Sequence, residues 1–182
     1  MATAEKPLPA SKQALLAKEG QPGIDPRGPR FGAGITAVLV LVVIGLALAG
    51  PALPPETIGA RATQPAFILL AAISALFAWG AFAGIRRHPY GLLFKKLVRP
   101  RLAPPAHLED PKPPTFSQGV GFVITFAGVV LSLVGVPYVL LIAAVFAFFA
   151  AFLNSVFDYC LGCQIYLLLV RAGVLGRGTR AA

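Results

Sequence analysis

Residues 113–157 read PPTFSQGVGFVITFAGVVLSLVGVPYVLLIAAVFAFFAAFLNSVF and contain no charged side chain. As one helix they would be about 67 Å long at 1.5 Å per residue. The hydrocarbon core of a bilayer is only about 30 Å thick, so the segment has to fold back on itself. Gly135-Val136-Pro137 is the predicted turn, because glycine suits a helix end and proline suits the first turn of the next helix.

Two further charge-free tracts precede this segment, at residues 33–55 and 62–85. Each is long enough to cross a bilayer, which takes about 20 helical residues. Of the 182 residues 57% are hydrophobic and 13% are charged, whereas about 25% are charged in soluble domains. We therefore expect an all-α integral membrane protein, built as a four-transmembrane-helix bundle. The expected spans are residues 32–50, 65–85, 117–135 and 137–155.

Helices are favoured for these spans because a helix satisfies its own backbone hydrogen bonds in lipid. A β-barrel would require alternating apolar and polar residues, which the tracts lack. Thr63 and Ser117 are the predicted caps of the second and third spans, and Asp25-Pro26 that of the first. The expected domains are a disordered cytoplasmic arm over residues 1–23, a membrane domain over 24–175 and a tail over 176–182. A short helix around residues 11–19 is the alternative for part of the arm.

The positions of Lys and Arg predict the orientation. The arm, the connection at residues 86–116 and the tail are rich in them, whereas the 51–64 loop contains only Arg61. The positive-inside rule then predicts a multi-pass protein of the plasma (inner) membrane with both termini in the cytoplasm. The same rule accounts for the net charge of +9, and we expect no binding to nucleic acid.

Ala47-Leu48-Ala49 resembles a signal-peptidase site, but the long arm before it contains acidic residues, unlike a signal peptide. We therefore expect the first span to be retained.

The connection at residues 86–116 contains YGLLFKKLV (90–98), which predicts a cytoplasmic amphipathic loop helix. Leu93, Phe94, Leu97 and Val98 would share one side, with Lys95 and Lys96 reaching toward lipid phosphates. The proline-rich stretches RPRLAPP and EDPKPP that follow predict extended spacers. Within the spans, Gly80 with Gly84 and Gly128 with Ser132 have the small-xxx-small spacing that allows helix backbones to approach closely.

DYCLGCQIY (158–166) contains the only two cysteines of the chain, Cys160 and Cys163. If the fourth span starts at Pro137, this motif lies at the cytoplasmic boundary, and the residues after it are too few to cross again. A short C-terminal interfacial segment and a partial return into the bundle both remain open for residues 156–170.

Cys160, Cys163 and Asp158 are the candidate catalytic residues. On a helix the two cysteines lie about 60° apart, close enough to form a redox pair. Transient oxidation, persulfide transfer and metal binding are compatible with a reducing cytoplasm, where a static disulfide is not expected. The competing interpretation is that both are inert packing residues. A helix start would stabilise a thiolate, but we expect the motif at a helix end.

Asp158 would lie about 160° from Cys160 on a continuous helix. Only a break at Leu161-Gly162 would bring the two together. The simpler role for Asp158 is a hydrated polar face shared with Asn154, one turn earlier.

No cofactor is expected. Covalent haem needs His directly after the second cysteine, and this position is Gln164. Zinc needs two further ligands, and His88 and His107 lack the spacing of a zinc motif.

Three motifs together resemble a family of small actinobacterial integral-membrane proteins catalogued as a domain of unknown function. They are IDPRGPRFGAGITA (24–37), LVRPRLAPPAHLEDPKPPTFSQGVG (97–121) and DYCLGCQIY, and the likeness extends over about residues 24–175. The resemblance implies four membrane helices with a Cys-Leu-Gly-Cys motif near the end. Its members are often encoded beside thioredoxin-like and sulfurtransferase genes, which implies a link to thiol or sulfur metabolism. It assigns no catalytic residue.

Two functions follow from these observations. The first is a thiol or sulfur relay, or a redox-linked role, through a cytoplasm-facing Cys160/Cys163 pair with a thioredoxin-like or sulfurtransferase partner. The alternative is a non-catalytic accessory subunit of a larger membrane complex. A transporter is third, because the spans offer few polar groups at mid-membrane. Whether the chain is an enzyme is left open at this stage.

Overall fold

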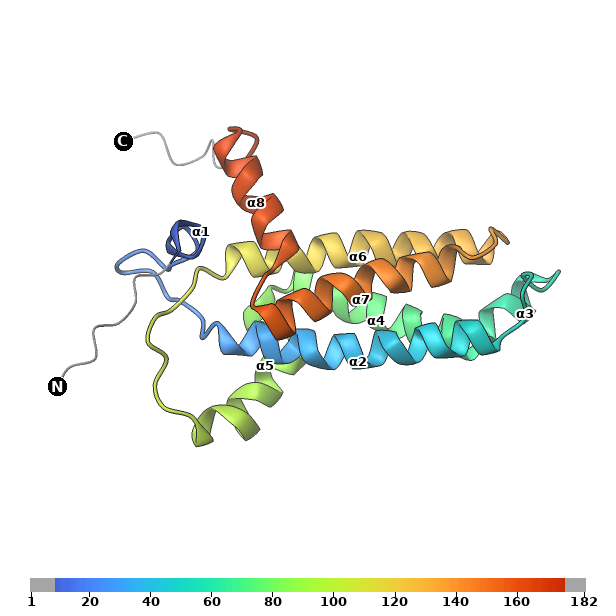
Figure 1. Ribbon diagram of the computed structural model, residues 1–182, viewed down its shortest axis with the longest axis horizontal. Coiled ribbons are helices and arrows are strands. Elements are labelled where there is room, and N and C mark those ends of the chain that lie inside the picture. The colour runs from blue at the N-terminus through green and yellow to red at the C-terminus, as the bar shows by residue number, and fades with distance from the viewer. Residues whose placement is uncertain (1–8, 176–182) are drawn as a thin grey trace.

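The four long apolar helices expected from the sequence form a bundle in the computed structural model, which describes residues 9–175 (Figure 1). They are α2 (Arg27–Ala49), α4 (Pro65–Phe82), α6 (Lys112–Leu133) and α7 (Val139–Phe157). Shorter helices connect or flank them: α1 (Ala10–Gln13), α3 (Ile58–Ala62), α5 (Pro89–Leu93) and α8 (Leu161–Arg171). The predicted all-α membrane bundle is thus confirmed, and the described residues contain no strand beyond isolated bridges. The expected tail, residues 176–182, lies outside the described residues.

The bundle is a square in which each long helix packs against two others. α2 packs against α7, α7 against α6, α6 against α4, and α4 against α2. The innermost side chains are Val40 and Val43 of α2, Leu70 of α4, Thr125 of α6 and Ala144 of α7. Small residues on α7 and branched residues on α2 and α4 therefore fill one narrow apolar core.

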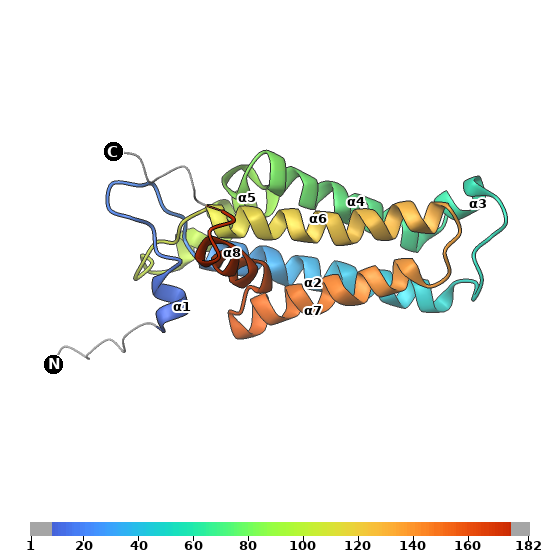
Figure 2. The ribbon, with the colours of Figure 1, turned by 90° about the horizontal axis from the view of Figure 1, so that it is seen from above.

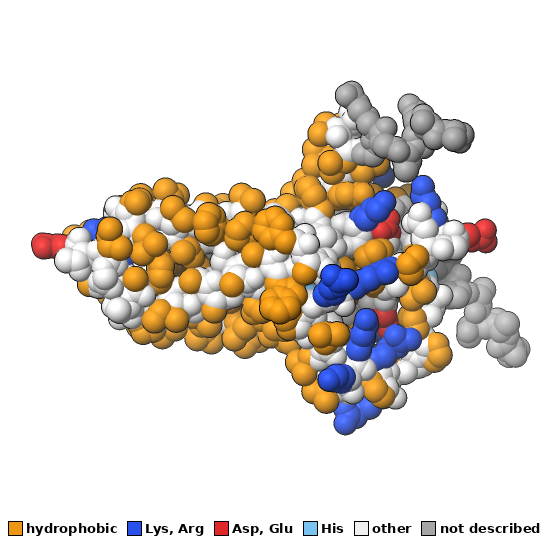
Figure 3. Space-filling model, turned by 180° about the vertical axis from the view of Figure 1, so that it is seen from behind, with side chains coloured by type: hydrophobic (Ala, Val, Ile, Leu, Met, Phe, Trp, Pro, Cys, Tyr) orange, Lys and Arg blue, Asp and Glu red, His pale blue; other side chains and the backbone are white. Residues whose placement is uncertain are grey.

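The outside of the bundle is as apolar as the inside. Only 17% to 33% of the most hydrophobic stretch of each long helix is buried, and large side chains such as Phe82, Val123 and Phe146 face outward. A soluble bundle would place polar residues there. Figure 3 shows this hydrophobic surface running along the bundle and ending at a cluster of Lys and Arg. Its surface is therefore suited to contact with the hydrocarbon of a bilayer.

Charge gathers at one end, which we call the basic end: the end where α2 and α6 begin and α4 and α7 finish. α1, α5 and α8 lie there, and α3 lies at the opposite end (Figures 1 and 2). The cations of the basic end are Lys12, Lys18, Arg27, Arg30, Arg86, Arg87, Lys95, Lys96, Arg99, Arg101, Lys112 and Arg171. Among the described residues of the opposite end, Arg61 is the one cation.

Arg61 closes the opposite end of the bundle. Its guanidinium donates to the carbonyl of Leu133, 2.9 Å away at the end of α6, and to that of Glu56 at 3.0 Å. The last carbonyls of a helix lack partners within the helix and favour a nearby cation. The predicted turn follows directly, with Gly135 at φ 88°, a conformation that glycine adopts without strain.

The helix starts differ from the expected ones. α6 begins at Lys112, so Ser117 lies inside it and does not cap it. Pro113 and Pro114, expected in an extended spacer, occupy its first turn, where a missing N–H costs no hydrogen bond. The residue before α4 is Gln64, whereas Thr63 ends α3. Asp25 does accept the N–H of Arg27, at 3.0 Å, at the start of α2.

The arm also differs from the expected disordered segment. Residues 1–8 lie outside the described residues, but residues 10–13 form α1 and Leu15 is buried. Backbone bridges join Leu16 and Ile24 to Glu109 in the connection before α6. Residues 9–23 are therefore packed against the basic end, because Leu15 finds an apolar contact on α8 that the sequence did not reveal.

The predicted amphipathic loop helix is present as α5 and a π-helical turn at Phe94–Val98. Of its apolar residues, Phe94 is 3% exposed and packs against Gly28 and Phe31 of α2, whereas Leu97 faces outward. Arg99, in the next turn, lies 3.5 Å from Asp25. Burial alone would raise the pKa of Asp25, but hydrogen bonds from Arg27 and the charges of Arg27 and Arg99 outweigh it and hold the pKa below its usual value.

Of the four small residues with small-xxx-small spacing, two lie where neighbouring helices approach closely. Gly128 of α6 faces the methyl group of Ala143 on α7 with no room for a side chain, and Gly80 of α4 packs against the flexible side chain of Gln118 of α6. Gly84, by contrast, lies beyond the end of α4 at φ 84° and contacts no other helix.

We predict that Gly128→Ala destabilises the bundle, because the new methyl group would overlap that of Ala143. Overpacking of this kind costs about 1–3 kcal/mol and should lower the thermal unfolding midpoint in detergent. The double variant Gly128→Ala/Ala143→Gly moves the methyl group from one helix to the other and should restore the midpoint. Gly45→Ala, which places a methyl group in open space on α2, is the control. Equal midpoints for Gly128→Ala and Gly45→Ala would contradict the packing of α6 against α7.

Candidate functional site

The helix is interrupted between α7 and α8, directly before the cysteine pair. Asp158 takes a left-handed conformation (φ 55°, ψ 35°) directly after α7, and Cys160 is the N-terminal cap of α8. This corrects two sequence expectations. The helix is not continuous through the motif, and its break lies at residues 158–160 rather than at Leu161-Gly162. The pair therefore lies at a helix start, not at a helix end.

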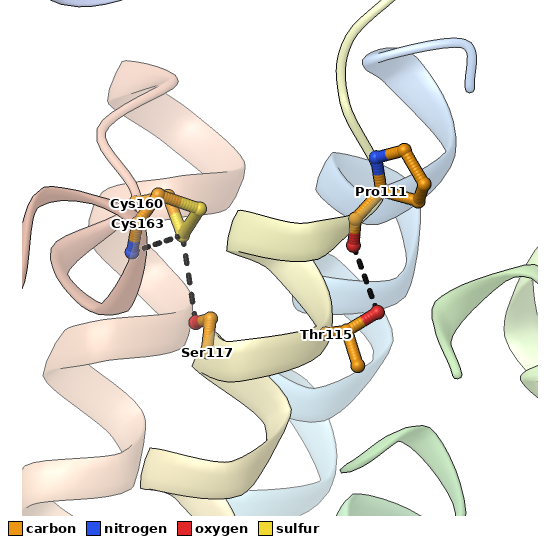
Figure 4. Close-up of a disulfide and its surroundings, with 5 residues drawn as sticks. All are labelled: Pro111, Thr115, Ser117, Cys160 and Cys163. Atoms are coloured by element: carbon orange, nitrogen blue, oxygen red, sulfur yellow. Dashed lines mark hydrogen bonds between the residues drawn. A yellow bond between two sulfur atoms is a disulfide. The ribbon is translucent and has the colours of Figure 1, made fainter. Parts of the chain in front are cut away.

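Cys160 and Cys163 form a disulfide across the first turn of α8, with their Cα atoms 5.2 Å apart (Figure 4). The backbone N–H of Cys163 donates to Sγ of Cys160 at 3.3 Å. Cys163 is 3% exposed, whereas Cys160 is partly accessible. The two sulfurs are thus chemically unequal: Cys160 can be reached from outside, and its sulfur already accepts a hydrogen bond that would stabilise a thiolate.

Ser117 of α6 lies beneath the pair. Its hydroxyl is 3.4 Å from Sγ of Cys160 and is the donor when the sulfur is in the disulfide (Figure 4). Gly162 allows this contact, because a Cβ there would lie 2.7 Å from the Cα of Ser117. The rings of Phe116 and Tyr166 pack beside it with centroids 5.6 Å apart. The start of α8 is therefore held against α6 at the level of the disulfide.

The arm covers the inner sulfur. Leu15 packs with Cys163 and Leu167 in an apolar cluster that is separate from the core of the bundle. Because Leu15 follows α1, the position of α1 determines how much of Cys163 is covered.

Asp158 was expected to share a hydrated polar face with Asn154. In the structure its carboxylate also forms ion pairs. Its carboxylate accepts from Lys12 in the arm and lies 3.6 Å from Nε of Arg30 in α2. Arg30 also donates to the carbonyl of Ser155, at 3.3 Å. Asp158 thus ties the arm and α2 to the break before Cys160. Among the hydrogen bonds of the described residues, none joins it to either cysteine.

Glu109 adds a second carboxyl beside these cations. Burial raises the pKa of Glu109, and the nearby charges of His107, Lys12 and Arg30 lower it without cancelling the effect. The backbone of Glu109 pairs with that of Ile24 in both directions, each bond at 2.9 Å. The carboxyl group is therefore fixed at the boundary between the arm and the cavity described next.

A cavity of about 260 Å³ opens beside the disulfide. Both cysteines line it, together with Lys12, Arg30, Glu109, Asp158 and Ser117, and it continues between α2, α6 and α7 along Thr36, Ile124 and Ala147. The site is therefore a thiol pair at the junction of a charged rim and an apolar interior.

Comparison with known proteins places the chain in a family. Residues 24–171 match the family model described as Domain of unknown function (DUF4395). The chain belongs to the DUF4395 family. Searches of curated proteins and of solved structures find no significant match. The resemblance stated from the three motifs is thus confirmed for the family.

The two histidines of this DUF4395 protein do not join the cysteines. His88 is buried. Its Nε2 lies 3.2 Å from the carbonyl of Leu76, and its Nδ1 accepts the N–H of Tyr90, so both nitrogens are engaged. Burial lowers the pKa of His88 and favours the neutral ring. No group of three or more His, Cys, Asp or Glu residues suited to a metal ion occurs within residues 9–175.

Several residues of the site escaped the sequence reasoning. Lys12, Arg30 and Glu109 come from three distant segments, and no local spacing connects them. Ser117 was assigned to a helix cap, although a hydroxyl one turn beyond a proline pair is equally compatible with a position inside the helix. Gly162 carried the one usable signal: a glycine between two cysteines indicates close backbone contact.

We predict that Asp158→Asn loosens the arm without unfolding the bundle. Asparagine tolerates the left-handed conformation of residue 158, so mainly the charge is lost. Partly exposed ion pairs contribute about 0.2–1 kcal/mol, so amide hydrogen exchange over residues 12–16 should rise by up to about fivefold. Glu56→Gln, at the opposite end, is the matched control. Unchanged exchange in Asp158→Asn would mean that the contacts of Leu15 alone hold the arm.

Proposed function

We propose that this DUF4395 protein is a membrane-bound thiol–disulfide exchange protein that uses Cys160 and Cys163. The observation that supports this most is the cap of α8, where the accessible sulfur of Cys160 accepts the N–H of Cys163 at the start of a helix. The helix dipole and this hydrogen bond both favour a thiolate. An inert packing cysteine needs neither.

The expected partner is a soluble thioredoxin-like protein that offers a dithiol. One thiolate of the partner attacks Sγ of Cys160, the disulfide breaks, and Cys163 leaves as a thiolate that takes up a proton. The second partner thiol then attacks the mixed disulfide, which oxidises the partner and releases Cys160. The same Cys160 thiolate suits a sulfurtransferase partner, from whose persulfide it would take the outer sulfur and release the partner's thiolate.

The basic end is proposed to face the cytoplasm of a cell with a plasma (inner) membrane. It concentrates the cations of the described chain, and cytoplasmic loops carry the excess of Lys and Arg in membrane proteins. Thioredoxin-like and sulfurtransferase proteins of the cytoplasm would then reach Cys160 directly. The charged rim of Lys12, Arg30 and Asp158 lies beside it and offers a polar docking surface.

The exchange function predicts unequal reactivity of the two sulfurs. In Cys163→Ala the remaining Cys160 should react with 5,5′-dithiobis(2-nitrobenzoate) at least about tenfold faster than Cys163 does in Cys160→Ser, because Cys163 is buried. Serine preserves the cap at position 160. A thioredoxin variant that retains only its attacking cysteine should form a mixed disulfide with Cys160 of the wild-type protein. Equal rates and no mixed disulfide would instead support the accessory-subunit hypothesis.

The orientation predicts which side of the membrane exposes the pair. After mild reduction with a membrane-permeable reductant, an impermeant maleimide should label Cys160 only when the membrane is opened. A cysteine placed at Glu56 in a cysteine-free variant should be labelled in intact cells. The reverse pattern would put the basic end outside and exclude cytoplasmic partners.

A further inference from the structure

The cavity beside the disulfide is deep as well as charged at its rim. Thr36 lies about nine residues inside α2, or roughly 14 Å from its start at 1.5 Å per residue. Phe146 lies about 11 residues, or roughly 17 Å, from the end of α7. The cavity therefore runs from the cysteines about halfway across the hydrocarbon layer.

The inner part of this cavity also borders the outside of the bundle. Phe146 lines it and is 63% exposed on the hydrophobic surface. At this point a lipid-facing side chain, and not the charged rim, separates the cavity from the bilayer.

Its lining changes character along its length. Beside the cysteines lie the hydroxyl of Ser117 and the cations of the rim, whereas the inner part is walled by Ile124, Ala147 and other apolar residues. Its volume, about 260 Å³, is below the roughly 300–1,000 Å³ that encloses a drug-sized ligand. The shape suits a ring-sized head group with polar atoms, whose apolar tail continues into lipid.

We propose that this cavity binds a membrane quinone, which exchanges electrons with the Cys160/Cys163 pair. The inference rests on the thiol–disulfide exchange function, and it names the second substrate. After it has oxidised a soluble dithiol, the reduced Cys160/Cys163 pair has two electrons to pass on, and a quinone is a two-electron acceptor that dissolves in the bilayer. The hydroxyl of Ser117, next to Cys160, would donate to one of its carbonyl oxygens.

The step balances without another reactant. The Sγ atoms of Cys160 and Cys163 form one S–S bond, and their two S–H bonds break. Two electrons and two protons pass to the two carbonyl oxygens of the quinone, which becomes the quinol. The disulfide is then ready for the soluble dithiol partner, so electrons flow from that partner through the pair to the bilayer.

The test uses the full-length protein in detergent without oxygen. The protein is reduced, freed of reductant and mixed with decylubiquinone, whose fully substituted ring resists addition of thiols. We expect loss of quinone absorbance equal to the disulfide formed, and a mass decrease that corresponds to two hydrogens rather than an adduct. Cys160→Ser and Cys163→Ala should reduce no quinone above the background of a small dithiol in the same detergent.

Variants of the cavity wall separate this inference from the exchange function. Ala33→Phe and Ala150→Phe, at half-buried positions that line the cavity, narrow it and should slow quinone reduction at least tenfold, whereas Ala127→Phe, exposed on α6, should not. Reduction of the disulfide by thioredoxin should stay normal in all three, which also shows that they fold. Quinone reduction that is absent in the wild type, or unaffected by both wall variants, would overturn the quinone site. If thioredoxin also failed to reduce the wild-type disulfide, the exchange function would fail with it.

Discussion

The lack of water in a hydrocarbon layer is the constraint on which this structure depends. Backbone groups that cannot bond to water must bond within their own segment, so each uncharged tract becomes a helix. The same constraint moves every charge and every irregular turn to the helix ends. The arm, the loop helix, the ion pairs and the disulfide therefore lie beyond the ends of the long helices, outside the apolar part of the bundle.

The elements that follow from this constraint alone could be predicted from the sequence. The number of spans, the turn at Gly135 and the amphipathic segment at residues 90–98 all depend on local composition. Helix starts were less predictable. Pro113 and Pro114, for example, are compatible both with an extended spacer and with the first turn of a helix. Whether such a pair ends a linker or begins a helix depends on the contacts of the residues around it.

The candidate site shows the same division. The two cysteines are visible as a motif, but their position at a helix start depends on Asp158, whose left-handed backbone ends α7. The side chain of Asp158 pairs with Lys12 and Arg30, which are far away in the sequence. Long-range ion pairs leave no periodic signal, so reasoning from helical angles placed Asp158 opposite Cys160 on a helix that does not continue.

Two residues, Leu161 and Gly162, stand between the cysteines, and the fold restricts them to different degrees. Here the second of them touches the backbone of Ser117, and any larger residue would lift α8 from α6. Leu161 is 37% exposed and free of that restriction. Substitution between the two cysteines is thereby confined to Leu161 if the contact of α8 with α6 is to be kept.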